Sequence, residues 1–426
     1  MNPPADEPAN GRAELRVDGP RLWRRIVELG EIGAIIGADG AHGCSRLALT
    51  DADRDGRDLV VGWMHDLGLV VAVDAIGNVI ATRPGTDPTA PTVMTGSHID
   101  TVVSGGRFDG NLGVLAGLEV VETLEQHGVQ TAHPISVAFF TDEEGARFAP
   151  DMLGSLVFAG GLPLEEALDI VAVDDAARLG DELDRIGYLG ALPCPTASAP
   201  HAYVELHIEQ GPILEEEGIT IGVVEGVQGI SWTEVSIAGR SAHAGTTPLR
   251  LRRDAAYVAA EITTFVRRLA IEIGGSQVAT VGRLDLRPDL VNVVAGSATL
   301  TVDLRNTDDA ELGRAEAALS AEIDRLAGAE GVIATTRSLA RYAPVDFDPS
   351  TVDLVEATAR RLGHSTRRIS SGAGHDAQML ARICPAAMIF TPSVAGLSHN
   401  IAEHTHPADV TAGADVLLQT LLSLAG

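Results

Sequence analysis

Short apolar runs alternate with longer, helix-periodic segments over the first half of the chain and again near its end. Most of the runs are too short for helices and almost wholly apolar, which is typical of strands buried on both faces of a parallel sheet. Two segments instead alternate polar and apolar residues on either side of Gly77-Asn78, which predicts two strands joined by a turn. The predicted strands are 70–74, 79–83, 92–98, 135–140, 202–207 and 386–390.

Helical periodicity marks the segments between these strands. One helix follows Thr50-Asp51, a pair suited to cap its first turn, and the helix at 113–125 has an amphipathic pattern. The predicted helices are 21–29, 55–67, 113–125 and 407–424, and 150–200 combines helices with loops. Strands that alternate with helices predict an α/β fold around a mostly parallel sheet, and ligands bind such sheets at the carboxyl ends of the strands.

The pattern changes after about residue 224, where strands and two long helices follow in the order β-α-β-β-α-β. This order is typical of a ferredoxin-like α+β domain. Its predicted strands are 230–238, 278–286, 298–304 and 332–336, and its predicted helices are 254–269 and 308–326. We therefore expect a disordered tail at 1–19, a discontinuous larger domain at 20–223 and 338–426, and an inserted domain at 224–337.

Acidic and imidazole side chains follow two of the predicted buried strands. The strand at 92–98 ends at His98 and leads to Asp100 and Asp109, and the strand at 135–140 leads to Glu143 and Glu144. Each of these residues alone fits an ordinary role, such as a loop salt bridge, a turn or a solvated acidic pair. Together they place much charge at adjacent strand ends, and uncompensated buried charge is very costly.

Two histidines strengthen this pattern, because His207 and His399 follow two further strands. Each alone would be interpreted as a core or loop histidine with its own hydrogen bonds. Acidic and histidine side chains gathered at four strand ends make that interpretation weak, and a pair of divalent metal ions is the simplest way to compensate the charge.

Composition excludes several other classes of function. The 426 residues carry a net charge of −28, which disfavours binding to nucleic acid and to anionic membranes. All 31 basic residues are Arg, and the absence of Lys excludes Schiff-base chemistry and a P-loop. No apolar run approaches the length of a membrane span, and 1–19 lacks the pattern of a secretory signal. Three scattered cysteines argue against a disulfide framework and favour a reducing, cytoplasmic location.

Six segments carry a family resemblance: GSHIDTVVSGGRFDG, TDEEGARF, VELHIEQGPILEEEG, GRSAHAGTTPLRLRRDA, SGAGHDAQML and GLSHNIAEHT. Together they resemble the hydantoinase/carbamoylase branch of the M20 metallopeptidase family, over nearly the whole chain from about 21 to 424. Members of this branch include N-carbamoyl-L-amino acid hydrolases, allantoate amidohydrolases, ureidoglycolate-type enzymes and β-ureidopropionases. The combined motifs are specific for the branch and only weakly specific for the substrate.

The resemblance implies two divalent metal ions per subunit. The implied ligands are His98 and His207 for one ion, Glu144 and His399 for the other, and Asp109 as the bridge. Asp100 would orient His98, and Glu143 would be the general base. Zinc or manganese would suit these ligands, with cobalt or nickel as alternatives.

The resemblance also implies three residues that contact substrate: His243, Asn292 and Arg305. Gln210 is a further candidate for contact with substrate or with water at the metal site. His243 would reach the partner subunit's active site and stabilise the oxyanion, while Asn292 and Arg305 would hold the substrate carboxylate. The ordinary alternatives are a loop histidine for His243 and a surface salt bridge for Arg305. His375 matches the family without a clear role. Asn306 stands where many relatives have His.

We therefore expect a binuclear amidohydrolase that cleaves the ureido C–N bond of an N-carbamoyl-L-amino acid or a related ureido acid. Allantoate or ureidoglycolate is the nearest alternative substrate, an aminopeptidase or dipeptidase is the next alternative, and a non-catalytic amino-acid-binding protein is the most remote. The inserted domain would act as a lid and form a homodimer, with no nucleic-acid or membrane partner.

Overall fold

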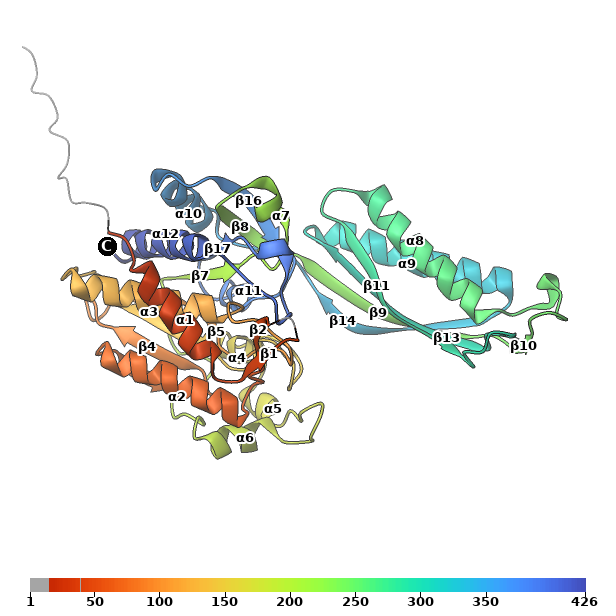
Figure 1. Ribbon diagram of the computed structural model, residues 1–426, viewed down its shortest axis with the longest axis horizontal. Coiled ribbons are helices and arrows are strands. Elements are labelled where there is room, and N and C mark those ends of the chain that lie inside the picture. Colours follow the sequence, from red (N-terminus) through yellow and green to blue (C-terminus); the bar gives the residue numbers. More distant parts are fainter. Residues whose placement is uncertain (1–14, 39) are drawn as a thin grey trace, which may run out of the picture. The chain divides into compact units, whose positions relative to one another are not determined.

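The computed structural model describes residues 15–38 and 40–426, and it divides into two compact units (Figure 1). The first unit consists of the chain up to Glu225 together with Phe347–Ile369 and Gly374–Gly426. The second unit consists of Gly226–Asp346 with Ser370–Ala373.

A mixed sheet forms the centre of the first unit, in the order β15-β8-β17-β7-β5-β6-β4-β3, with β16 also paired to β8. Its middle strands β17, β7, β5 and β6 are parallel, and β8, β15, β4 and β3 pair antiparallel with their neighbours. The predicted α/β fold with a mainly parallel centre is therefore confirmed. The strands are β3 (Val70–Val73), β4 (Val79–Arg83), β5 (Val93–His98), β6 (Ile135–Phe140), β7 (Ala202–Ile208), β8 (Ile221–Val227), β15 (Val345–Asp346), β16 (Thr366–Ser371) and β17 (Ala386–Thr391), with a separate hairpin of β1 (Ala34–Ile36) and β2 (His42–Cys44).

Helices cover both faces of this sheet. Successive side chains of a strand point to opposite faces. Leu206 of β7 lies against α12, because a Cβ added to Gly413 of that helix would be 2.7 Å from the Cδ1 atom of Leu206. The neighbouring residue of β7, Glu205, instead accepts a hydrogen bond from the N–H of Ala377 in α11. The helices α11 and α12 therefore lie on opposite faces. The helices of this unit are α1 (Gly19–Gly30), α2 (Asp51–Asp66), α3 (Asn111–Gln126), α4 (Leu153–Phe158), α5 (Leu164–Leu168), α6 (Leu179–Ile186), α7 (Ile213–Glu217), α10 (Pro349–Arg361), α11 (Asp376–Leu380) and α12 (Pro407–Ala425).

The helix α3 is buried on nearly all sides, so the amphipathic pattern expected at 113–125 was misleading. Helices α1 and α12 pack against it, and the three helices lie side by side in Figure 1. Its polar side chains make contacts inside the protein. Glu119, for example, is fully buried and forms an ion pair with Arg21 of α1 at 2.6 Å. A charged residue on a helix therefore faced another helix and not solvent.

The predicted tail at 1–19 falls mostly outside the described residues, which begin at 15. Its last part does not match the prediction. Val17 is buried and its N–H donates to Asp415 of α12 at 2.8 Å, and α1 begins at Gly19. The chain is therefore packed against the C-terminal helix before the predicted end of the tail.

The second unit has an antiparallel sheet in the order β11-β13-β9-β14, with α8 and α9 packed against the sheet and against each other. Its elements follow the order β-α-β-β-α-β, with one small added pair of strands. They are β9 (Gly229–Ala238), α8 (Ala255–Ile273), β11 (Val278–Arg287), β13 (Ser297–Asn306), α9 (Asp309–Glu330) and β14 (Ile333–Tyr342), with β10 (Ala242–His243) paired to β12 (Val293–Val294).

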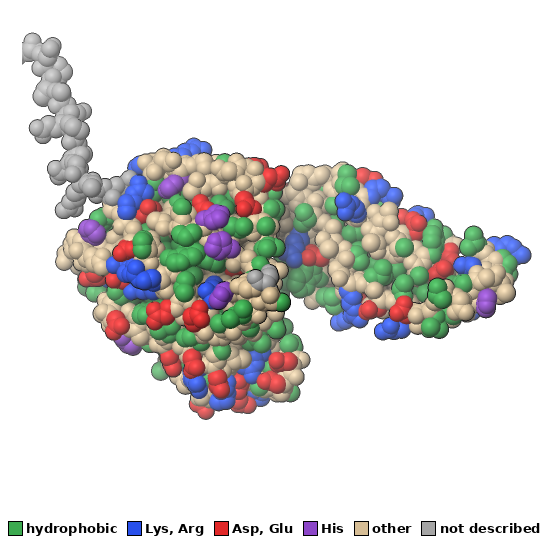
Figure 2. Space-filling model, viewed as in Figure 1, with side chains coloured by type: hydrophobic (Ala, Val, Ile, Leu, Met, Phe, Trp, Pro, Cys, Tyr) green, Lys and Arg blue, Asp and Glu red, His purple; other side chains and the backbone are tan. Residues whose placement is uncertain are grey.

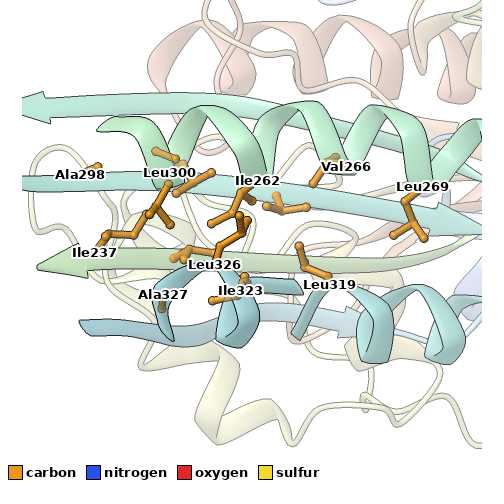
Figure 3. Packing of buried hydrophobic residues seen from close by; sticks show 14 of the residues in the cluster. Ile237, Ile262, Val266, Leu269, Ala298, Leu300, Leu319, Ile323, Leu326 and Ala327 are labelled. Atoms are coloured by element: carbon orange, nitrogen blue, oxygen red, sulfur yellow. The ribbon is translucent and has the colours of Figure 1, made fainter. Parts of the chain in front are cut away.

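Apolar side chains from the sheet and both helices form the core of this unit, and Figure 3 shows Ile237 and Leu300 of the strands beside Ile262 and Ile323 of the helices. The boundary that we placed at 337/338 falls inside β14, which stays paired with β9 as far as Tyr342. Residues 337–342 of this strand read RSLARY, in which two arginines and a serine interrupt the apolar residues, so this stretch lacks the continuous apolar signal that marked the other strands.

Acidic and basic side chains are interspersed over the visible face of the molecule in Figure 2. The strong net charge of −28 is thus not gathered there in a single acidic patch. In the part of the chain that the structure describes, every helix is too short or too polar to span a bilayer.

Candidate metal centre

The register of the parallel strands brings four strand ends together in the first unit. His98, the last residue of β5, lies beside Phe140, the last residue of β6. His207 of β7 lies beside Phe390 of β17. Because the carboxyl ends of parallel strands share one edge, the segments that follow them converge there.

The first group of possible ligands joins His98, Asp109 and His207, all buried. The Nε2 atoms of His98 and His207 lie 3.6 and 3.1 Å from Asp109 Oδ1. Each Nδ1 lies within 3.0 Å of a backbone carbonyl, that of Asp100 for His98 and that of Ile208 for His207. These carbonyls favour a proton on Nδ1 and leave Nε2 available as a metal ligand.

Gly110 allows Asp109 to approach these imidazoles. It has a φ of +64°, and a Cβ at this position would lie 2.4 Å from the ring of His98. A larger residue would therefore meet both backbone strain and a collision with a ligand. The glycine after Asp109 is required by the geometry of the site itself.

The second group joins Asp109, Glu144 and His399. His399 Nε2 lies 3.1 Å from Glu144 Oε2 and 3.6 Å from Asp109 Oδ2. The side chain of His399 is 53% exposed, so this group opens toward solvent. His399 has a φ of +52°, a strained conformation for a non-glycine residue that is common at functional sites.

Asp109 is thus shared, with one carboxylate oxygen facing each group. Burial alone would raise the pKa of Asp109, but hydrogen bonds from His207 and His98 outweigh burial and hold it well below its usual value. Asp109 therefore stays ionised, and an ionised carboxylate with both oxygens presented to separate ligand sets is what bridging two cations requires.

Glu143 lies beside the first group without belonging to either one. It is 7% exposed, and its Oε2 is 3.4 Å from His98 Nε2. Burial raises the pKa of Glu143 well above its usual range, further helped by Asp376 and opposed by His98. A carboxyl group whose pKa is shifted upward in a buried site is suited to exchange protons near neutral pH.

Asp100 has a different contact from the one that we expected. Its carboxylate is 3.8 Å from His98 Nδ1, whereas its backbone carbonyl is at 3.0 Å. The two carboxylate oxygens instead accept hydrogen bonds from the N–H groups of Glu143 and Glu144, each at 3.3 Å. Asp100 therefore orients residues from two segments: its carbonyl contacts the imidazole of His98, and its carboxylate binds the main chain of Glu143 and Glu144.

Sequence reasoning missed Ser398 and Glu403, which surround Asp109 together with Gln210. Gln210 Nε2 and Ser398 Oγ donate to Asp109 Oδ2 at 2.8 and 2.9 Å. Glu403 is buried and accepts the N–H groups of Phe108 and Asp109. Burial raises the pKa of Glu403 to about 8. Both residues lie in the segment GLSHNIAEHT that contributed to the family resemblance, which was the signal that could have indicated them.

His375 lies against the first group. Its ring centroid is 4.6 Å from that of His207, and burial, together with the nearby His207, lowers the pKa of His375 well below its usual value. It is therefore a neutral imidazole. With Glu205 and His207 it forms a third cluster of possible donor atoms, which shares His207 with the first group.

These residues fit a pair of divalent ions. The two groups offer only imidazole nitrogens and carboxylate oxygens, and each has three protein donors with Asp109 in common. Three protein ligands per ion leave a coordination position for water or substrate, as a catalytic site requires. This donor set does not select one metal among zinc, manganese, cobalt and nickel.

Two of the expected substrate residues, His243 and Asn292, lie together in the second unit. β10 pairs with β12, and the Ala244 N–H donates to the Asn292 carbonyl at 2.9 Å. His243 is exposed, and its Nδ1 accepts the N–H groups of Gly245 and Thr246. In the neutral imidazole this leaves the proton on Nε2, which is then a hydrogen-bond donor.

Arg305 lies at the other end of this unit. It pairs with Asp303 at 2.8 Å and also donates to the Gly372 carbonyl. The strand β13 begins at Ser297, which is close in sequence to Asn292, and Arg305 is near its other end. In an extended strand, Ser297 and Arg305 are about 27 Å apart. Asn306 is buried, where it accepts the Asp308 N–H and donates to Gln277, so its side chain is occupied by local structure.

The two ligand groups share the carboxylate of Asp109, and the carboxylate of Glu143 lies beside them outside both groups. This arrangement, at the strand ends of an α/β sheet, is typical of metal-dependent hydrolases. A model of peptidase family M20/M25/M40 matches residues 94–423. The chain belongs to this family and to the hydantoinase/carbamoylase branch that its motifs indicated, and it is a hydrolase of amide C–N bonds.

Similar proteins cover almost the whole chain. It is 44% identical over 410 residues to an N-carbamoyl-L-amino-acid amidohydrolase of Rhizobium meliloti, covering 96% of this chain and 97% of that protein. It is 41% identical over 414 residues to an N-carbamoyl-L-amino acid amidohydrolase of Geobacillus stearothermophilus, covering 96% and 99%. Among solved structures, an amidase of the hydantoinase/carbamoylase family from Burkholderia multivorans matches with a TM-score of 0.93 and 47% identity, covering 96% of this chain and 98% of that one.

Proposed function

We propose that this enzyme hydrolyses the ureido C–N bond of N-carbamoyl-L-amino acids with two divalent metal ions. The observation that carries the proposal is Asp109, whose two carboxylate oxygens face separate ligand groups while Glu143 lies beside them outside both. The substrate class is supported by the relatives named N-carbamoyl-L-amino acid amidohydrolases, which match over nearly their whole length.

His98, Asp109 and His207 would hold one ion, and Asp109, Glu144 and His399 would hold the other. When bound, the ions would act as Lewis acids that lower the pKa of a water molecule and polarise the ureido carbonyl. Zinc and manganese are our first choices, because both accept mixed imidazole and carboxylate ligands.

Glu143 Oε2 would take a proton from the attacking water and return it to the leaving nitrogen. The water oxygen bonds to the carbamoyl carbon, and the bond from that carbon to the amino-acid nitrogen breaks. The products are the amino acid and carbamate, which decomposes to ammonia and carbon dioxide. Asp100 would keep Glu143 in reach through the hydrogen bond to its N–H.

His243 Nε2 would donate to the developing oxyanion, and Asn292 and Arg305 would bind the substrate carboxylate. His243 and Asn292 are neighbours, whereas Arg305 is about 27 Å along β13 from their end of the unit. Both ends of one unit cannot contact one small substrate. We therefore propose that the enzyme is a homodimer in which His243 and Asn292 serve the partner's site and Arg305 its own.

We also propose a reducing, cytoplasmic location. Cys44, Cys194 and Cys384 are all buried thiols that form no disulfide. Unpaired thiols of this kind are usual in proteins of reducing compartments.

A substrate panel tests the proposed activity. N-carbamoyl-L-amino acids, allantoate, ureidoglycolate, 3-ureidopropionate and dipeptides are each incubated with enzyme and Mn²⁺ or Zn²⁺. Ammonia release fastest from an N-carbamoyl-L-amino acid supports the proposal. Fastest release from allantoate or ureidoglycolate would mean that this compound, and not an N-carbamoyl-L-amino acid, is the substrate. Dipeptide cleavage without ammonia release would mean that the enzyme is a peptidase.

A further inference from the structure

Arg46 is a fully buried arginine of the first unit, located just after β2. Its guanidinium donates to oxygen atoms from four separate positions in the chain. Nε donates to the Ile99 carbonyl at 2.8 Å, and Nη2 donates to Asn111 Oδ1 at 2.8 Å. Nη1 donates to the carbonyls of Leu29 and Ile32 at 2.9 and 2.8 Å.

The charge of Arg46 is compensated without an acidic partner. Over the described residues, each hydrogen-bonding partner of its guanidinium is a neutral oxygen or the Cys44 sulfur. Two of the carbonyls are at or just past the C-terminal end of α1, where the helix dipole is negative and the last carbonyls lack partners within the helix. A buried charge with only neutral partners is expensive, so its contacts need an explanation.

Those contacts link the two segments that carry His98 and Asp109. Ile99 directly follows His98, and Asn111 is the first residue of α3, two positions after Asp109. The main chain of Arg46 adds two hydrogen bonds to Thr101, through its N–H to Thr101 Oγ1 at 2.7 Å and through its carbonyl at 3.0 Å. One side chain therefore fixes the end of β5 relative to the start of α3.

We propose that Arg46 is a positioning residue that sets the spacing between His98 and Asp109 and so preorganises the first ligand group. This inference rests on the proposed metal site. Arg46 contacts neither a ligand side chain nor substrate, and it would act only through the main chain of Ile99 and the side chain of Asn111. The planar fork of Arg reaches acceptors in several directions at once, which the single ammonium of Lys cannot reproduce.

The test compares Arg46→Lys and Arg46→Ala with the wild type and with Arg83→Lys. Arg83 is the matched control, because it is also a buried arginine that contacts a main-chain carbonyl, that of Val129. It lies beside Ile135, at the opposite end of β6 from the metal centre. Co²⁺ is titrated into metal-free protein and followed by its visible absorption, and circular dichroism confirms that each variant is folded.

We expect wild type and Arg83→Lys to bind two Co²⁺ ions alike. In both Arg46 variants the affinity for one ion should fall about 10- to 100-fold, as for other residues that orient metal ligands. The second ion should lose less affinity, because its group shares only Asp109 with the first. Added guanidinium chloride at low millimolar concentration should restore binding in Arg46→Ala, and equal sodium chloride should not. If the folded Arg46 variants bind both ions like the wild type, or if Arg83→Lys loses as much affinity, the inference is wrong.

A second variant keeps the inference testable should replacement of Arg46 prevent folding. Asn111→Ala removes one acceptor and leaves Arg46 in place, so it should weaken the same ion to a smaller degree. Unchanged binding of both ions by Asn111→Ala would then overturn the inference. A wild-type protein that binds no Co²⁺ would instead overturn the proposed metal site, so the two failures are distinguishable.

Discussion

Replacing Glu143 by Gln tests the assignment of the general base. A general base contributes about 10²- to 10⁴-fold to a rate, which corresponds to roughly 3–5 kcal/mol at about 1.4 kcal/mol per factor of ten. The structure favours the upper half of this range, because three of the neighbouring carboxylates already have other partners. Glu144 and Asp109 belong to the ligand groups, and Asp100 is occupied by the N–H groups of the acidic pair.

The same substitution should leave metal binding intact. Burial lowers the pKa of His98, but Glu143 is the largest of the groups that together raise it well above its usual value. Removing that negative charge makes His98 easier to deprotonate, so a metal ion has less competition from a proton. We therefore expect Glu143→Gln to lose about 10³- to 10⁴-fold in kcat with an unchanged metal content.

The assay is steady-state ammonia release, with metal content measured on the same samples. Asp142→Asn is the matched control, because it makes the same acid-to-amide change one residue earlier. Asp142 is in neither ligand group and, over the described residues, forms no ion pair with a ligand histidine as Glu143 does, so its kcat should stay within about tenfold of wild type. A Glu143→Gln enzyme with two ions and near-normal kcat would refute the assignment, as would an equal loss in Asp142→Asn.

Three further changes probe other parts of the account. Arg305→Ala should raise KM for carboxylate substrates about 10- to 100-fold, as expected for a lost charged hydrogen bond, and an unchanged KM would remove Arg305 from the substrate site. A hydrogen bond from Glu144 raises the pKa of His399 to about 9. Below that pH an ion must displace a proton, so metal affinity should fall as the pH drops from 9 toward 7, and affinity independent of pH would contradict this. Leu300→Ala, at a fully buried position in the second unit, should lower the free energy of unfolding by about 2–5 kcal/mol in urea titrations; a negligible loss would mean that the core is loosely packed.

The sequence was sufficient for the parts of the site that follow from strand ends. His98 and the Glu143-Glu144 pair could be placed together because adjacent parallel strands align their carboxyl ends, and the structure has His98 beside Phe140. His207 and His399, which are distant in sequence, were also indicated by strand ends, and the family resemblance assigned each of them to an ion. The structure brings both of them to Asp109.

The remaining features depend on contacts that residue types do not reveal. The partners of Arg46 are mostly main-chain carbonyls from other segments, and a carbonyl leaves no mark in the sequence. The carbonyl of Asp100, and not its carboxylate, contacts His98 for the same reason. The N-terminus of α10 was predictable and was missed: Asp348 caps it and accepts the Thr351 N–H, with Pro at the first helical position.

The most direct test of the central claim is the dependence of ammonia release on the number of bound ions. Metal-free enzyme is titrated with Mn²⁺ or Zn²⁺, and ammonia and amino acid formed from N-carbamoyl-L-methionine are measured at each ratio. The two ligand groups that share Asp109 predict activity that rises until two ions per chain are bound, with ammonia and amino acid formed in equal amounts. Full activity in the metal-free protein, saturation at one ion, or no ammonia with both ions bound would contradict the account.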